Sequence, residues 1–240
     1  MTDIRIPAAD AVGDVEPFAH CWIAEGTSTA NRARDWAERC IHLPAASMSI
    51  FRTAGLESPA EMPTLPFPHP ADVVVVGVSD QADRTRAREL VNLFGCSIVI
   101  VPDEHPHGWG VVAGVDRTDT AAITGAAAGS AAEDAEEPLL LVHAVATRLH
   151  PFSARPEHTD PALRIARESV QRHHPLVAVT CRLRTTDPST ALLDEARGRS
   201  LLVVGGERIT SSASVLGQLI DRVAVPMLIA RGGGSHRLSR

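Results

Sequence analysis

The sequence of 240 residues contains no lysine, so all 23 of its basic residues are arginine. This absence excludes a Walker-A phosphate loop, which needs its lysine, and every mechanism that uses a lysine amine as nucleophile or Schiff base. The 29 acidic residues outnumber the basic ones and give a net charge of −6. A mildly acidic chain lacks the positive surface that binds phosphate backbones, so we expect no nucleic-acid partner.

Long apolar runs and clustered cysteines are missing as well. No apolar segment approaches the roughly 18 residues that a membrane span requires, and the first residues do not have the pattern of a signal peptide. We therefore expect a cytoplasmic protein without membrane contact. The four cysteines form no CxxC pair and the eleven histidines show no metal-ligand spacing. This predicts buried, reduced thiols and no metal site.

Short apolar runs alternate with helical patterns along most of the chain. The runs at residues 73–76, 139–142 and 201–204 are typical of strands that are buried on both faces of a parallel sheet, with helices as crossovers. The sequence therefore predicts an α/β protein.

The chain also resembles itself at an offset near 130 residues. Gly77 falls on Gly205 and Leu90 falls on Leu219, in a register that persists over several consecutive elements. A persistent register of this kind indicates duplication. We therefore predict two copies of one domain.

The segment 105–110 is rich in proline and glycine and is the predicted linker. It separates a domain of residues 1–104 from a domain of residues 111–231, and residues 232–240 have the composition of a disordered tail. The second copy has the pattern of five strands and four helices: strand 111–116, helix 119–135, strand 139–146, helix 160–173, strand 175–184, helix 189–197, strand 200–205, helix 212–223 and strand 225–231.

The first copy is predicted to be incomplete. The segment around His20 matches the segment around His143, so we expect the first copy to begin at its second strand, with residues 4–6 as the candidate remnant of the first strand. The last strands of the copies, at 97–101 and 226–230, would be apolar sheet edges, which proteins cover or pair. We expect them to pair with each other within one chain, while the gap in the first copy could also drive a homodimer.

The second copy resembles the universal stress protein family, in its tandem-domain form. The matching residues are a first strand that ends in Asp116, a second strand at 139–145, and a closing block that runs from 201–205 to a Val-Pro-led strand at 225–231. The resemblance extends over residues 18–102 of the first copy. It implies two doubly wound parallel-sheet domains of Rossmann-like type, the first of them incomplete.

In that family the members that bind ATP carry a loop after the fourth strand with three spaced glycines, the last followed by serine or threonine. Glycines let backbone N–H groups surround the phosphates, and the next helix adds the positive end of its dipole. Gly205 fits this pattern, but Arg208 stands at the second glycine. The next glycine, Gly217, comes one residue early and is followed by Gln218. Arg208 could itself pair with a phosphate.

Hydroxyl residues surround the start of the last helix, and they either offer donors to a phosphate or simply cap the helix. These residues are Thr210, Ser211, Ser212 and Ser214. In the first copy, residues 77–83 form the corresponding loop, where two carboxylates stand in the place of a phosphate. We therefore expect no ATP in the first copy.

The resemblance implies a ligand site in the second copy, with Asp116 near an adenosine moiety. The candidate binding residues are Val115, Asp116, Ala144, Gly205, Arg208, Gly217 and Gln218. The resemblance, with its fold block preserved beside an altered phosphate loop, implies a stress-response protein that binds a protein partner or a small anionic ligand. No Gly-x-Ser-x-Gly nucleophile elbow is present, and we expect the protein to be non-catalytic. No cofactor is expected, but the second domain could take AMP or ATP, the latter no tighter than about 10 μM. A nucleotide-dependent enzyme that uses the second domain is the alternative hypothesis.

Overall fold

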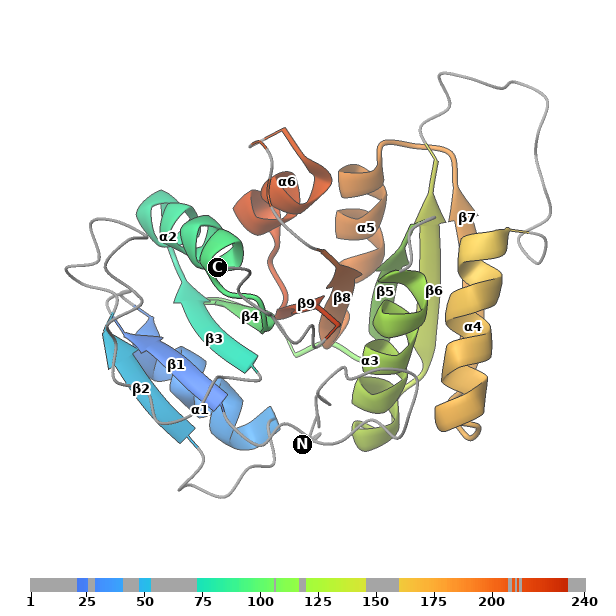
Figure 1. Ribbon diagram of the computed structural model, residues 1–240, viewed down its shortest axis with the longest axis horizontal. Coiled ribbons are helices and arrows are strands. Elements are labelled where there is room, and N and C mark those ends of the chain that lie inside the picture. Colours follow the sequence, from blue (N-terminus) through green and yellow to red (C-terminus); the bar gives the residue numbers. More distant parts are fainter. Residues whose placement is uncertain are drawn as a thin grey trace, which may run out of the picture.

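The computed structural model describes residues 21–25, 29–40, 48–52, 73–105, 107–116, 120–145, 160–206, 209, 211 and 213–232. Within these residues, nine strands form one sheet and six helices pack against it (Figure 1). Residues 4–6, Arg208 and nearly all of the predicted tail lie outside the described part. The prediction of a doubly wound α/β fold is confirmed.

The two copies are called here the first half, up to residue 105, and the second half, from residue 107. The first half contains β1 (Cys21–Glu25), α1 (Ala30–Cys40), β2 (Met48–Arg52), β3 (Val73–Val78), α2 (Gln81–Leu93) and β4 (Ser97–Pro102). The second half contains β5 (Val111–Val115), α3 (Thr120–Asp134), β6 (Leu139–Ala144), α4 (Pro161–His173), β7 (Val179–Arg184), α5 (Pro188–Ala196), β8 (Leu201–Gly205), α6 (Val215–Arg222) and β9 (Met227–Ala230).

The strands are ordered β2-β1-β3-β4-β9-β8-β5-β6-β7. All neighbouring strands run parallel except β4 and β9. In the second half the order reverses between β5 and β8, because the chain winds outward from β5 to β7 and then returns to build β8 and β9 on the other side. This is the arrangement of a doubly wound sheet.

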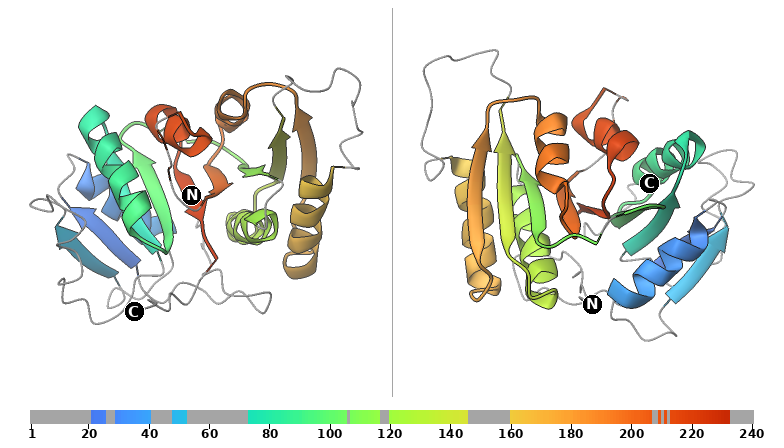
Figure 2. Two further views of the ribbon diagram at one scale, coloured as in Figure 1. Left: turned by 45° about the horizontal axis from the view of Figure 1, so that its top comes forward. Right: turned by 180° about the vertical axis from the view of Figure 1, so that it is seen from behind.

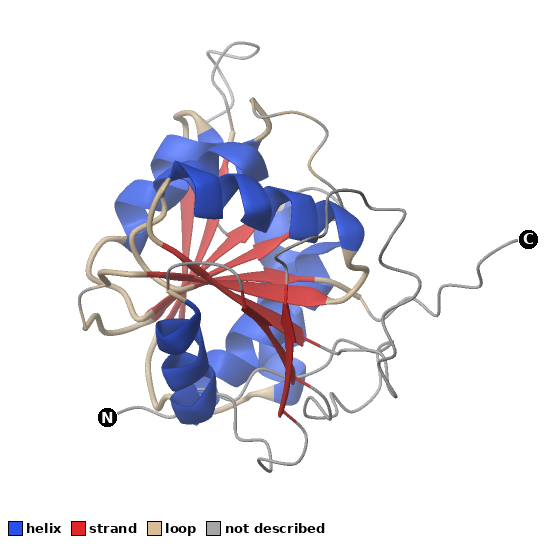
Figure 3. Ribbon diagram, turned by 90° about the vertical axis from the view of Figure 1, so that its left-hand side faces the viewer, coloured by secondary structure: helices blue, strands red, loops and turns tan. Residues whose placement is uncertain are grey.

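Helices cover both faces of the sheet (Figure 3), and each face has its own apolar core. Helices α1, α3 and α4 pack on one face, and α2, α5 and α6 pack on the other. Successive strand residues point to opposite faces, so Val73 and Val75 join the first core while Val74 and Val76 join the second. This explains why the central strands are continuous apolar runs.

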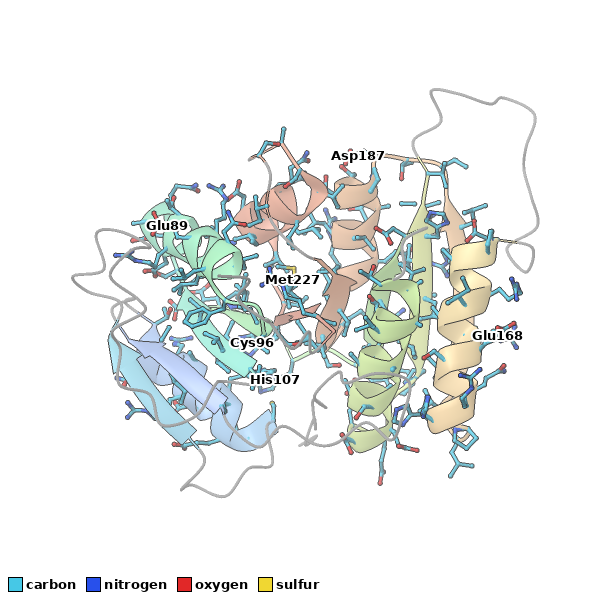
Figure 4. The ribbon with its side chains drawn as sticks, in the orientation of Figure 1. Glu89, Cys96, His107, Glu168, Asp187 and Met227 are labelled. Carbon is cyan, nitrogen blue, oxygen red and sulfur yellow. The ribbon has the colours of Figure 1, made fainter. Side chains whose placement is uncertain are left out.

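The two halves meet where β4 and β9 pair antiparallel, and we call this pairing the seam. Ile98 lies opposite Ile229, and Ile100 lies opposite Met227. All four side chains are fully buried, and Met227 lies near the middle of the molecule (Figure 4). The seam therefore joins the halves into one continuous sheet and leaves neither strand as an edge.

The topology corrects the predicted register of the first half. β1 pairs with β3 as β5 pairs with β8, and β2 flanks β1 as β6 flanks β5. β1 is therefore the counterpart of the first strand of the second half, and the predicted match of His20 with His143 is wrong. Within the described residues, β7 is the strand that has no counterpart in the first half. The sequence misled because one short apolar strand looks like another, and only its hydrogen-bonded neighbours distinguish them.

Within the described residues, none of the helices is both long and apolar enough to cross a lipid bilayer.

Candidate functional site

A cavity of about 240 Å³ lies at the carboxyl edge of the sheet, where the strand order reverses between β5 and β8. Doubly wound sheets bind their ligands at this place. Strands β5, β6 and β8 form its floor, and α3, α5 and α6 contribute its walls. Its apolar lining includes Val142, Leu192, Val204, Leu216 and Leu219.

Four of the candidate residues from the sequence surround this cavity: Val115, Asp116, Ala144 and Gly205. Two others, Gly217 and Gln218, lie in α6 but are not among the residues that line it. The seventh, Arg208, lies outside the described residues. The candidates at strand ends therefore line the cavity, whereas the two candidates in α6 do not.

The polar groups of the cavity are concentrated at its rim. Asp116 follows the last residue of β5 and is exposed, and its carboxylate Oδ1 accepts a hydrogen bond from Thr120 Oγ1 at 3.3 Å. Among the described lining residues, Asp116 is the ionisable one. The site is thus an apolar slot with one hydrogen-bond-accepting carboxylate beside its opening.

Gly205 is required by packing, whatever the site binds. A Cβ atom on this residue would lie 2.5 Å from Thr124 Oγ1 and 2.8 Å from Thr120 Oγ1. Gly77 occupies the equivalent position in the first half, where a Cβ would lie 2.5 Å from the carbonyl oxygen of Thr29. Both glycines allow the first helix of their half to approach the strand that carries them, β3 or β8, so a glycine here does not by itself indicate phosphate binding.

At the start of α6, a serine side chain caps the helix. Ser214 is the N-cap residue, and its Oγ accepts a hydrogen bond from the Gly217 N–H at 3.1 Å. The Gln218 side chain donates to the Ala213 carbonyl at 2.9 Å and lies 2.7 Å from Ser189 Oγ in α5. For Ser214, capping is therefore the role that the structure shows. Neither Gly217 nor Gln218 directs a donor into the cavity.

Helix α5 contributes a wall of the cavity that the sequence did not predict. Leu192 packs against Gly114 in β5, where a Cβ would lie 2.7 Å from the leucine methyl carbons. Asp187 caps the helix, and hydrogen bonds from Ser189 Oγ and the Thr190 N–H lower the pKa of its carboxyl group. Figure 4 shows Asp187 at the start of α5. No short sequence motif indicates this wall, because the wall depends on packing between elements that are distant in sequence.

The equivalent loop of the first half is occupied by its own carboxylates. Asp83 is buried, and its Oδ2 accepts hydrogen bonds from both the N–H and the Oγ of Ser79, each at 3.0 Å. Asp80 caps α2 by accepting from the Asp83 N–H at 2.9 Å. Donors that an anion would need are thus used by protein oxygens.

Two groups of ionisable side chains in the second half lie away from the cavity lining. His143 Nδ1 and Asp160 Oδ2 are 2.9 Å apart and buried between β6 and the start of α4. Glu195 in α5 pairs with Arg182 and Arg184 of β7. Burial alone would raise the pKa of Glu195, but the hydrogen bonds and charges of the two arginines outweigh it and lower that pKa. Within the described residues, no three His, Cys, Asp or Glu side chains are grouped as metal ligands.

No protein-family model and no curated protein matches the sequence. Solved structures are similar to the chain. A universal stress protein from Archaeoglobus fulgidus DSM 4304 has a TM-score of 0.54 at 12% identity, covering 86% of this chain and 75% of that one. A universal stress protein in complex with cAMP has a TM-score of 0.44 at 22% identity and covers 53% of this chain and 99% of that one. A universal stress protein from Archaeoglobus fulgidus in complex with dAMP has a TM-score of 0.43 at 17% identity, covering 52% of this chain and all (100%) of that one. The chain has the fold of the universal stress proteins.

Proposed function

We propose that the chain is a tandem universal stress protein whose second half binds a small nucleoside-type ligand without turning it over. The observation that supports this proposal is the cavity at the strand-order reversal, with its apolar walls and the Asp116 carboxylate at its rim. A cytoplasmic location and a protein partner remain predictions from the sequence.

The chemistry of the cavity suits a base and a ribose. A planar base gains free energy when its faces leave water for apolar side chains such as Leu192 and Leu216. A ribose carries two neighbouring hydroxyl donors, and an ionised carboxylate is purely an acceptor. Asp116 is therefore positioned to accept hydrogen bonds from the sugar, as acidic residues do in other doubly wound sheets.

The size of the cavity limits what it encloses. Its volume of about 240 Å³ lies below the range of about 300–1,000 Å³ that is usual for ligand pockets. The nucleoside part of a ligand would fill it, and phosphates would extend along the loop between β8 and α6. We propose that Gly205 lies nearest this anionic end, and Arg208, outside the described residues, is the phosphate partner that the sequence pattern predicts.

The same loop should bind a triphosphate weakly. Ser214 already accepts the Gly217 N–H, and the Gln218 side chain is bonded to α5 and to Ala213. The Gly217 N–H and the Gln218 Nε2 would have to leave these protein acceptors in order to donate to a phosphate. We expect a dissociation constant for ATP no tighter than about 10 μM, which is near −7 kcal/mol.

Calorimetric titration with adenosine, AMP, ADP and ATP tests this proposal. We expect binding in the micromolar range or weaker, with AMP at least as tight as ATP, and a loss of about tenfold in Asp116→Ala because a carboxylate hydrogen bond to the sugar is removed. Asp194→Ala, which removes an exposed carboxylate of α5 outside the cavity lining, is the matched control and should bind normally.

Three results would contradict the proposal. Failure of the wild-type protein to bind any of these compounds would overturn the nucleoside site. A sub-micromolar constant for ATP would show that the loop grips phosphate despite its internal bonds. ATP turnover that is lost in Asp116→Ala would favour a nucleotide-dependent enzyme instead.

A further inference from the structure

A side chain of the first half bonds to the loop between β8 and α6 in the second half. Asn92 lies in the last turn of α2, and its Oδ1 accepts a hydrogen bond from the Ile209 N–H at 2.7 Å. Its Nδ2 donates to the Ile209 carbonyl at 3.2 Å. One amide group thus bonds both the donor and the acceptor of a residue in the loop between β8 and α6.

The start of the same loop is tied to the same helix. Arg231, just after β9, donates from Nε to the Gly206 carbonyl at 2.9 Å. Its other guanidinium nitrogens donate to the carbonyls of Val91, at 2.6 Å, and Phe94 at the end of α2. A cation in this place is also favoured by the negative end of the helix dipole. The loop therefore has two anchor points, and both rest on α2.

The seam places α2 where it can act on this loop. Helices α2 and α6 lie side by side in Figures 1 and 2. An ion pair between Arg88 and Asp221 joins them, and Arg84 donates to the Ile220 carbonyl at the end of α6. These contacts hold α2 against α6, and the bonds described above hold Gly206 and Ile209 on α2, without any ligand.

We propose that α2 of the first half positions the phosphate-side loop of the second half, with Asn92 as the positioning residue. This inference rests on the proposed nucleoside site. Ordering a loop around a ligand costs conformational entropy, and contacts that already order it in the unliganded protein reduce that cost at the binding step. The half whose own loop is filled by Asp83 thereby contributes to binding in the other half.

The test compares ligands with and without a phosphate. In the proposed site adenosine contacts only the apolar slot, whereas AMP also contacts the loop. Loosening the loop should therefore weaken the binding of AMP and leave the binding of adenosine unchanged. In Asn92→Leu we expect the Ile209 amide to exchange with solvent at least tenfold faster, AMP affinity to fall by about fivefold, and adenosine affinity to stay within about twofold. Asn31→Leu makes the same chemical change at an exposed position of α1 and should alter none of these quantities.

A conservative variant separates positioning from general damage. Asn92→Asp keeps the acceptor for the Ile209 N–H but loses the donor to its carbonyl, so its AMP affinity should lie between those of wild type and Asn92→Leu. Unchanged amide exchange at Ile209 in Asn92→Leu would show that the two hydrogen bonds from Asn92 do not hold this residue. Equal weakening of AMP and adenosine would overturn the positioning role and leave Asn92 merely structural. If wild type binds neither compound, the proposed function fails and the positioning role fails with it. The exchange rates still decide whether Asn92 holds Ile209.

Discussion

Helices α2 and α6 begin in different ways, although each follows its strand, β3 or β8, in the same strand-loop-helix arrangement. In the first half, the buried Asp83 carboxylate accepts the Ser79 donors within the loop. In the second half, the uncharged Ser214 caps the helix, and the space beside the strand ends remains a cavity. One copy of the fold has thus filled its ligand side with its own anion, and the other has kept an apolar slot. Retaining a fold and retaining a site are separate matters.

Alanine at the two equivalent glycines should distinguish the halves most strongly. A Cβ at Gly77 would lie 2.5 Å from both the main-chain carbonyl oxygen and the hydroxyl of Thr29, whereas at Gly205 the near atoms belong to the side chains of Thr124 and Thr120, whose hydroxyls can rotate. We expect Gly77→Ala to lower the free energy of unfolding by about 3 kcal/mol and Gly205→Ala by about 1 kcal/mol. Urea denaturation measures both. Equal losses of unfolding free energy in the two variants would show that the main chain at Thr29 shifts as easily as the threonine side chains around Gly205.

The two helix starts give the next largest contrast. Asp83→Asn keeps the shape of the side chain but replaces the charged oxygen with a neutral amide oxygen, which is a weaker acceptor for the two Ser79 donors. We expect a loss of about 2 kcal/mol, because a buried donor is left weakly paired, against about 1 kcal/mol for Ser214→Ala. Both values come from denaturant unfolding at pH 7. A stabilised Asp83→Asn would show that repulsion between Asp80 and Asp83 outweighs their hydrogen bonds, contrary to the anion-like role assigned to Asp83.

The smallest effect concerns β7, the strand that the described first half lacks. Glu195 holds Arg182 and Arg184 of this strand, and its pKa is lowered in the folded protein. Such a group stabilises the fold at pH values above its unfolded pKa of about 4.3, and this contribution is lost as the pH falls through the lower folded value. The arginines are partly exposed, so we expect Glu195→Gln to cost no more than about 1 kcal/mol at pH 7.

Unfolding experiments at several pH values check this prediction. The stability difference between wild type and Glu195→Gln should be constant from pH 7 to about pH 5 and should shrink as the pH falls below about 4. A difference that persists unchanged at pH 3 would indicate lost packing and not a lost ion pair.

The sequence predicted those features that depend on local pattern. Apolar runs identified the central strands. Asp116, which follows β5, and Gly205, which ends β8, indicated where the cavity lies, because strand ends meet at the point of reversal. It misidentified β1, since its place is defined by pairing with β3 and not by its composition. It also missed Leu192 and Asn92, whose roles arise from contacts between distant segments.

The seam can form only late in protein synthesis. β4 gains its second neighbour only when β9 has been made, so during synthesis the first half emerges from the ribosome with one open edge on a largely apolar strand. Such strands invite pairing with other chains. Until residues 227–230 arrive, the nascent protein should depend on chaperones, and ribosome-stalled fragments ending before β9 should aggregate where the full chain does not.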